Sequence, residues 1–196
     1  GAGVDKITGG DGADTITGGE GADVISGGKG VDTINLTETT AANDVVVFGN
    51  EGIVTGGTDI GFASLAGADA ITGFDQATDD LTFDISGFGL GAGSTVGAGA
   101  IGAMLVDSSE EVYIITGGGY ATDELMEDAV AARVTTNGYD MVIAYFNTTT
   151  NKTHIVHDTD ASVDGTGTTT LIATLEDFNT QTAHDTLDAT NIVMFA

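Results

Sequence analysis

The sequence contains no cysteine and no proline, and only four of its 196 residues are lysine or arginine. Without cysteine the chain can form neither disulfides nor thiolate metal sites, so it lacks the usual covalent staple of extracellular proteins. The 30 acidic residues bring the formal net charge to −26, which leaves no basic patch for nucleic acid or for anionic membrane surfaces. With 41% hydrophobic residues, the chain is too apolar for an acidic disordered tail. We therefore expect a fold that needs bound cations to offset its negative charge.

The sequence also lacks a secretory signal peptide and any apolar run long enough to cross a membrane. It starts inside a repeat and has no initiator methionine. We expect it to be the C-terminal piece of a larger protein, with further repeats upstream.

The first 35 residues repeat with a period of nine. They read GAGVDKIT, GGDGADTIT, GGEGADVIS and GGKGVDTIN, with one glycine missing from the first unit. Glycine fills the first, second and fourth positions of each complete unit, aspartate the sixth and isoleucine the eighth. This is the nonapeptide G-G-x-G-x-D-x-U-x of calcium-binding parallel β-structures. A low-complexity Gly-Asp linker would not keep isoleucine in phase across four units.

The spacing of the repeat predicts a coil of two units. The adjacent glycines permit positive φ, so the backbone can turn sharply and bring its carbonyls inward. The last three residues of each unit predict a very short strand, with only the middle isoleucine facing inward. Positions 18 apart then stack, which places Asp5 beneath Asp23 and Asp14 beneath Asp32. Carboxylates stacked this closely repel unless a cation lies between them, and hard oxygens suit Ca²⁺.

At these residues the sequence resembles the RTX (repeats-in-toxin) family of type I-secreted bacterial proteins. The resemblance implies a parallel β-roll that holds several Ca²⁺ ions in the turns between coils. The aspartates would bind through their carboxylates, and the turns through backbone carbonyls, including that of the variable third position. The ligand residues implied in this way are Asp5, Asp14, Asp23 and Asp32, with Gly9, Gly10, Asp11, Gly12, Gly18, Gly19, Glu20, Gly21, Gly27, Gly28, Lys29 and Gly30 in the turns.

Beyond Asn35 the repeat degrades without disappearing. Residues 39–47 keep Asp44 at the acid position, and residues 64–72 keep Gly67 and Asp69. We expect both segments to extend the coil. Threonine and alanine occupy the glycine positions of the first segment and tolerate positive φ poorly, so we expect its turn to bind calcium poorly.

Other acidic and histidine residues are weaker candidates. Two acidic clusters are open to interpretation either as further calcium ligands or as ordinary turn chemistry: Asp75, Asp79 and Asp80, and Asp158, Asp160 and Asp164. The second cluster is not an EF-hand, because Val163 stands where that loop requires glycine. His154 and His157 are three apart in a predicted strand and so point to opposite faces, which argues against a shared metal. No motif for hydrolysis or nucleotide binding is present, and we expect no enzyme activity from these residues.

The whole chain is predicted to be mainly β, in two parts. Residues 1–83 form the roll with its degenerate final coils, and residues 84–196 form a β-rich cap with one short helix. The helix, residues 122–134, is capped by Thr122 and packs through Leu125, Ala129 and Ala132. The predicted strands are residues 112–116, which end at the glycines 117–119, then 141–147, 153–158, 169–175 and 191–195. Residues 141–147 are apolar on both faces, which predicts a central strand.

The order of these strands resembles, more loosely, the C-terminal regions of type I-secreted RTX proteins, whose uncleaved C-terminus carries the export signal. The sequence thus favours a calcium-dependent folding, type I secretion and assembly module of a secreted bacterial surface protein. High Gly, Ala and Thr without Cys or Pro is typical of surface-layer (S-layer) proteins. The alternatives are the C-terminal region of a large RTX adhesin, or of a secreted RTX toxin or hydrolase. Expected partners are calcium, the type I secretion machinery, and further copies or cell-surface polysaccharide.

Overall fold

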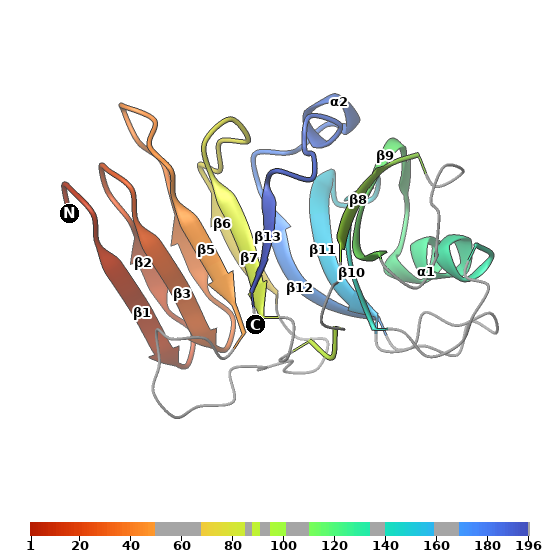
Figure 1. The fold of residues 1–196 in the computed structure, drawn as a ribbon, viewed down its shortest axis with the longest axis horizontal. Helices are drawn as coiled ribbons and strands as arrows, with labels where there is room; N and C mark the ends of the chain where they lie inside the picture. The colour runs from red at the N-terminus through yellow and green to blue at the C-terminus, as the bar shows by residue number, and fades with distance from the viewer. Residues whose placement is uncertain are drawn as a thin grey trace.

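A computed structural model describes residues 1–49, 68–84, 88–90, 95–100, 110–133, 140–158 and 169–195. The fold is mainly β, as predicted, and is built on two sheets (Figure 1). One sheet has five strands in the order β1-β3-β5-β7-β13, and the other has eight in the order β2-β4-β6-β12-β11-β10-β9-β8. The described residues also contain two helices, α1 and α2.

Successive strands of the repeat region alternate between the two sheets. The five-stranded sheet takes β1 (Lys6–Asp11) and β3 (Val24–Lys29), and the eight-stranded sheet takes β2 (Thr15–Thr17) and β4 (Thr33–Asn35). Both pairs are parallel, and Ile7 stands opposite Ile25 as Ile16 stands opposite Ile34. The predicted 18-residue coil is therefore confirmed.

The strands on the two sides of the roll differ in length. Strands β2 and β4 have the predicted three residues, whereas β1 and β3 have six. Pairing continues into the turns of β1 and β3, where Gly10 pairs with Gly28 and Asp11 with Lys29. The prediction of very short strands is thus wrong for β1 and β3, because their parallel pairing continues into the glycine turns.

Both degenerate segments continue the coil, as predicted. Strand β5 (Val45–Phe48) pairs with β3, and β6 (Asp69–Thr72) pairs with β4. The inward isoleucine of β4 stands opposite that of β6. Strand β7 (Asp80–Asp84) then adds to β5. Gly67 lies outside the described residues.

Both sheets continue into the C-terminal half. Strand β12 (Thr169–Leu175) pairs parallel with β6, and β13 (Ile192–Phe195) pairs parallel with β7. The eight-stranded sheet goes on through β11 (Lys152–Asp158), β10 (Met141–Asn147), β9 (Glu110–Tyr120) and β8 (Thr95–Gly99). All seven residues of β10 are buried between β9 and β11, so the predicted central strand is confirmed.

Two features of this half differ from the prediction. Residues 117–119 were expected to end a strand, but β9 runs on to Tyr120. Tyr145 pairs with Ile115 while Asn147 pairs with Tyr120, so the glycines form an irregular segment inside the strand. Strand β8 lies in a Gly/Ala-rich stretch for which the sequence predicted no element.

The helix α1 (Asp123–Ala131) begins as predicted, because the Thr122 hydroxyl accepts a hydrogen bond from Leu125 N at 3.1 Å. Its packing face was wrongly predicted. Met126 and Val130 are fully buried, whereas Leu125 is 51% exposed. The face of α1 that contacts the sheet is thus formed by Met126 and Val130, each one residue after the predicted Leu125 and Ala129. The second helix, α2 (Gln181–His184), was not predicted. Neither described helix is long and apolar enough to cross a membrane.

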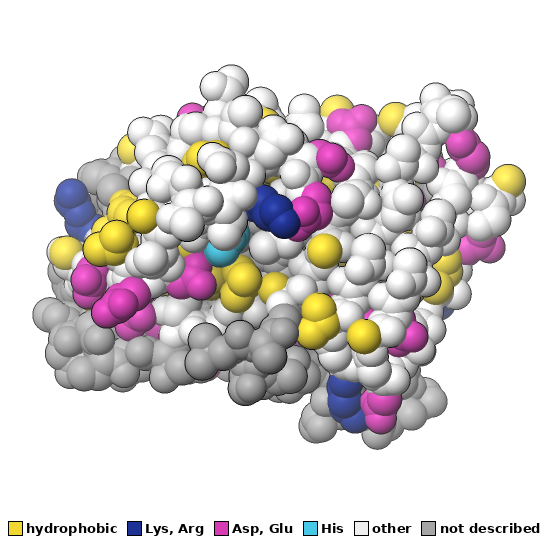
Figure 2. All heavy atoms as spheres, turned by 180° about the vertical axis from the view of Figure 1, so that it is seen from behind, with side chains coloured by type: hydrophobic (Ala, Val, Ile, Leu, Met, Phe, Trp, Pro, Cys, Tyr) yellow, Lys and Arg dark blue, Asp and Glu magenta, His cyan; other side chains and the backbone are white. Residues whose placement is uncertain are grey.

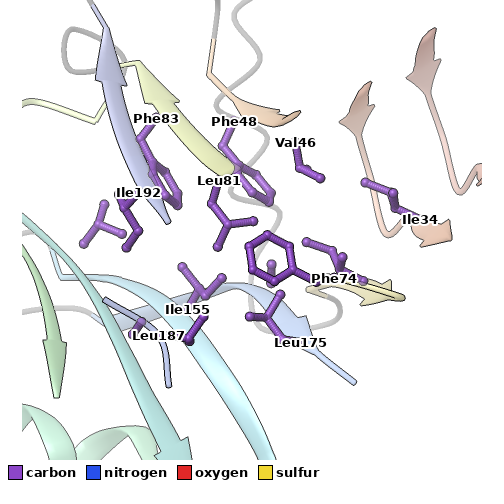
Figure 3. Packing of buried hydrophobic residues seen from close by; sticks show 14 of the residues in the cluster. Ile34, Val46, Phe48, Phe74, Leu81, Phe83, Ile155, Leu175, Leu187 and Ile192 are labelled. Atoms are coloured by element: carbon purple, nitrogen blue, oxygen red, sulfur yellow. The ribbon is translucent and has the colours of Figure 1, made fainter. Parts of the chain in front are cut away.

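The main core lies between the two sheets (Figure 3). The inward residues Ile25, Ile34 and Ile71 are fully buried, and Ile7 in the first coil is partly buried. Phe48 stacks on Phe83 with ring centroids 5.2 Å apart. A second cluster on the other face of β9 and β10 packs under α1 through Met126 and Val130. The roll and the C-terminal half therefore share the first cluster, and only the C-terminal half contains the second.

Candidate calcium sites in the turns of the roll

The repeat aspartates form two ladders that join successive coils. We call Asp5, Asp23, Asp44 and Asp79 ladder A, and Asp14, Asp32 and Asp69 ladder B. At each step the carboxylate Oδ1 of one aspartate accepts a hydrogen bond from the backbone N–H of the aspartate one coil before, at 2.7–3.0 Å. The predicted stacking is confirmed, and it extends through both degenerate coils. One oxygen of every ladder carboxylate after the first thus holds two coils together.

The second carboxylate oxygen is in a different situation. The Oδ2 atoms of Asp14, Asp23 and Asp32 are buried and have no hydrogen-bond partner. Asp23 and Asp32 are fully buried as residues. A buried charged oxygen without a partner is costly, so each of these atoms calls for a positive group.

The first glycine of each unit makes room in front of that oxygen. A Cβ atom at Gly9 would lie 2.7 Å from Asp14 Oδ2, and one at Gly18 would lie 2.8 Å from Asp23 Oδ2. A Cβ at Gly27 would overlap Asp32 Oδ2. None of these three glycines has positive φ. Their role is therefore to give space to the carboxylate.

The second and fourth glycines have the conformational role. Their φ angles are positive, for example +100° at Gly28 and +134° at Gly30. Of the two adjacent glycines, which were expected to permit positive φ, the second adopts it and the first does not. A Cβ at Gly28 would overlap the carbonyl oxygen of Gly10. Carbonyls of one turn therefore point at the glycines of the next turn, beside the aspartates.

The third positions contribute more than was predicted. The carbonyls of Glu20 and Lys29 accept hydrogen bonds at 2.7 Å from the fourth-position glycines one coil before. The Lys29 ammonium lies 3.3 Å from Asp11 Oδ1 in an exposed ion pair. The side chain of Glu20, in contrast, accepts hydrogen bonds from Thr39 and Thr40. A long-range side-chain role at this position was not visible in the sequence.

The chemistry of these turns fits Ca²⁺. Ca²⁺ takes six to eight oxygen ligands, and carboxylates and backbone carbonyls are its usual donors in proteins. The turns offer both kinds, with unpartnered carboxylate oxygens next to stacked carbonyls. Among the described residues, no group of three or more acidic or histidine side chains is placed to hold a metal by itself. Backbone carbonyls would therefore have to complete any site here.

The electrostatics of the ladders favour a cation as well. Burial raises the pKa of Asp44 to about 6, and the charges of Asp79, Glu38 and Asp23 add to this effect. Burial also raises the pKa of Asp32, with a contribution from Asp14. In the absence of a cation, these carboxyls are therefore easier to protonate than in the unfolded chain.

The other acidic candidates have partners within the protein or are not among the described residues. Asp79 ends ladder A and also accepts a hydrogen bond from Asp75 N at 2.8 Å. Asp80 accepts one from Asn43 at 3.1 Å. Asp158 is buried in β11. Asp160 and Asp164 lie outside the described residues.

The histidines point to opposite faces, as predicted. His154 Nδ1 lies 3.0 Å from Asp123 Oδ1, and its Nε2 lies 2.8 Å from the Thr150 hydroxyl. His157 Nε2 contacts the carbonyl of Phe88 at 3.1 Å on the other side. The Asp123–His154–Thr150 contacts form a continuous chain, and the backbone N–H of Thr150 donates to Asn147 Oδ1 at 3.0 Å. The chain thus fastens the β10–β11 hairpin to α1.

The repeat region is a parallel β-roll of the kind that binds calcium in its turns. Its stacked coils, glycine turns and paired aspartates are the features of that class. Residues 1–34 match the family model of the RTX calcium-binding nonapeptide repeat in four copies, so these residues are RTX repeats. Such repeats bind calcium and are typical of secreted or extracellular proteins. No curated protein and no solved structure matches the chain.

Proposed function

We propose that this chain is a calcium-dependent folding, type I secretion and assembly module of an extracellular bacterial surface protein, most consistent with an S-layer protein. The observation that carries the proposal is the row of buried, unpartnered Oδ2 atoms of Asp14, Asp23 and Asp32 within RTX repeats. We propose no catalytic role for it.

Calcium would act as the switch between an exportable and a folded state. At low calcium the buried carboxylates lack counter-charges, and the net charge of −26 favours expansion. The face in Figure 2 carries acidic side chains over both halves and few basic ones. Outside the cell, a ligand that binds only the folded state stabilises it by about 2.7 kcal/mol per site at 100 times its Kd. Each ladder step then joins the coils through Oδ1 while Oδ2 faces the ion.

The switch is tested by circular dichroism and hydrogen exchange in EGTA and in millimolar calcium. In the wild type we expect calcium to increase the β signal and to protect the amides of residues 24–35. The variant with Asp14, Asp23 and Asp32 changed to Asn should lose this response, since asparagine keeps the Oδ1 acceptor but not the charge. Asp128→Asn, an exposed change on α1, is the control and should respond like the wild type. Identical spectra and exchange in EGTA and calcium would refute the switch.

Assembly at the cell surface is tested on the full-length protein. We expect it to form an ordered array with calcium and to disperse in EGTA, as seen by electron microscopy. Soluble monomers under both conditions would contradict an S-layer role. Export through a type I transporter is tested by comparing secretion from cells with and without that transporter.

A further inference from the structure

The turn at residues 36–42 closes a coil without the glycines that the other turns use. Thr39, Thr40 and Ala42 occupy the positions of the first, second and fourth glycines, yet β5 joins the sheet in register after it. The structure shows what replaces the glycine pattern. Two glutamates, one from this turn and one from the turn below it, cross between the two turns.

Each glutamate accepts at least one hydrogen bond from a backbone N–H across this gap. Glu38 Oε1 accepts from Gly21 N and its Oε2 from Ala42 N, both at 2.7 Å. Glu20 accepts from Thr39 N at 2.9 Å, from the Thr39 hydroxyl at 2.6 Å and from Thr40 N at 3.3 Å. We call these two side chains the Glu20–Glu38 clamp.

The clamp is built from hydrogen-bond donors and carboxylates alone. Both oxygens of each carboxylate face N–H or O–H groups, so the clamp closes without a cation. Hydrogen bonds from the Thr39 hydroxyl and N–H lower the pKa of Glu20, which keeps this carboxylate charged. The clamp therefore needs no bound cation of its own.

Glu20 also connects the clamp to the first coil. Its backbone N–H donates to Gly1 O at 3.0 Å, and its carbonyl accepts from Gly3 N at 2.7 Å. Its side chain reaches the turn above, while its backbone lines the turn below. Glu20 thus joins turn 18–21 to the turns on both sides of it. This is the turn in which Gly18 lies in front of the unpartnered Asp23 Oδ2.

We propose that Glu20 and Glu38 are positioning residues for calcium at seam A, the gap between turns 1–4 and 18–21 with Asp5 and Asp23. This inference rests on the proposed function. In the folded roll the clamp fixes turn 18–21 whether or not an ion is bound there, so binding at seam A loses less chain entropy than binding to an unclamped turn. Seam B is the gap between turns 9–12 and 27–30 with Asp14 and Asp32. The side chains at its third positions, Asp11 and Lys29, form an exposed ion pair with each other and reach no further turn among the described residues.

The test compares the two seams in one protein. Asp14→Asn with Asp32→Asn leaves seam A, and Asp5→Asn with Asp23→Asn leaves seam B. Glu38→Gln is then added to each background, and calcium affinity is measured by isothermal titration calorimetry. Glutamine places an N–H₂ group against one of two N–H donors, so the clamp opens. We expect about tenfold weaker calcium binding at seam A, in the range seen for residues that orient metal ligands, and no change at seam B.

Glu20→Gln should act in the same direction, and Glu124→Gln, an exposed change on α1, should change neither seam. Hydrogen exchange in saturating calcium checks that each variant folds. Equal weakening at both seams would show a general loss of stability and would refute positioning. Unchanged affinity at seam A would refute it too, while leaving the proposed function intact. If neither background binds calcium, the proposed function itself is wrong.

Discussion

The roll and the C-terminal half belong to the same two sheets, but their buried polar groups differ in kind. In the roll these groups are carboxylates such as Asp23, Asp32 and Asp44, stacked on one another. In the C-terminal half they include neutral histidines with partners inside the protein. His184 Nε2 lies 2.7 Å from the Ile115 carbonyl, and its Nδ1 lies 2.9 Å from the Thr153 hydroxyl.

The cores of the two regions differ as well. A coil of the roll buries one isoleucine from each strand, whereas β10 is buried along its whole length on both faces. We therefore expect the stability of the C-terminal half to depend mainly on its apolar packing, and the stability of the roll to depend on the ions that its buried carboxylates bind. All four tyrosines of the chain lie between Tyr113 and Tyr145, which gives the C-terminal half its own spectroscopic signal.

The largest effect should come from the glycine turns. Gly28→Ala places a Cβ in a backbone with φ of +100° and onto the Gly10 carbonyl. We expect a loss of roughly 3 kcal/mol in the free energy of unfolding of the roll, from backbone strain and overpacking together. The matched change Gly118→Ala in β9 meets no atom within 4 Å, and should cost less than about 0.5 kcal/mol.

Urea unfolding in saturating calcium measures both glycine variants. Exchange of the amides in residues 24–35 follows the roll, and tyrosine fluorescence follows the C-terminal half. Equal destabilisation by the two changes would contradict the assigned difference between the regions.

Lowering the pH should change the stability of the two regions in opposite directions when calcium is removed by EGTA. Asp32, Asp44 and Asp79 have raised pKa values in the fold because of burial. The folded roll therefore binds more protons than the unfolded chain, and its stability rises as the pH falls from about 6 toward 3.8. Burial lowers the pKa of His157 and His184. The unfolded chain takes up these protons first, so the C-terminal half loses stability as the pH falls below 6.5.

This prediction is checked by following both signals from pH 7 to pH 5 in EGTA, a span of roughly two units about the histidine value. Amides of residues 24–35 should become roughly tenfold better protected, the equivalent of one pKa unit. The near-ultraviolet signal of the tyrosines should melt at lower temperature. If both regions gain or both lose stability over this pH range, their ionisable groups do not account for a difference between them.

The smallest effect should come from the cap of α1. Thr122→Ala removes the hydroxyl that accepts from Leu125 N and should cost about 1 kcal/mol. The loss should appear in thermal melting followed by tyrosine fluorescence, and Thr122→Ser should restore most of it. Calcium titration of the roll should stay unchanged. A weaker calcium response in this variant would mean that the two halves are coupled through α1.

Local signals predicted much of this fold. The nine-residue period gave the coil, its 18-residue register and the stacked aspartates. The apolar run at residues 141–147 gave the central strand, and Thr122 gave the start of α1. These features depend on residues near in sequence or repeated at a fixed spacing. Such patterns can be recognised in the sequence without knowledge of the tertiary structure.

The rest depends on contacts between distant residues. The pairing of β12 with β6 and of β13 with β7 joins segments about a hundred residues apart, and no local pattern records it. The buried face of α1 was set by the sheet beneath it rather than by the spacing of leucine and alanine. The clamp escaped prediction because Glu20 occupies a variable position and its partners lie in a turn that has left the repeat. The predicted boundary at residue 83 and the ligand set remain predictions.

The aspartate ladders also have a mechanical consequence. Each coil is joined to the next by a short parallel strand on either side and by one aspartate hydrogen bond per ladder. Tension applied at the first turn peels the outermost coil away first, because the force acts on the contacts between that coil and the next one. The roll should therefore peel coil by coil under low force, and lengthen gradually instead of rupturing at once. Bound calcium would set the force at which each coil comes away.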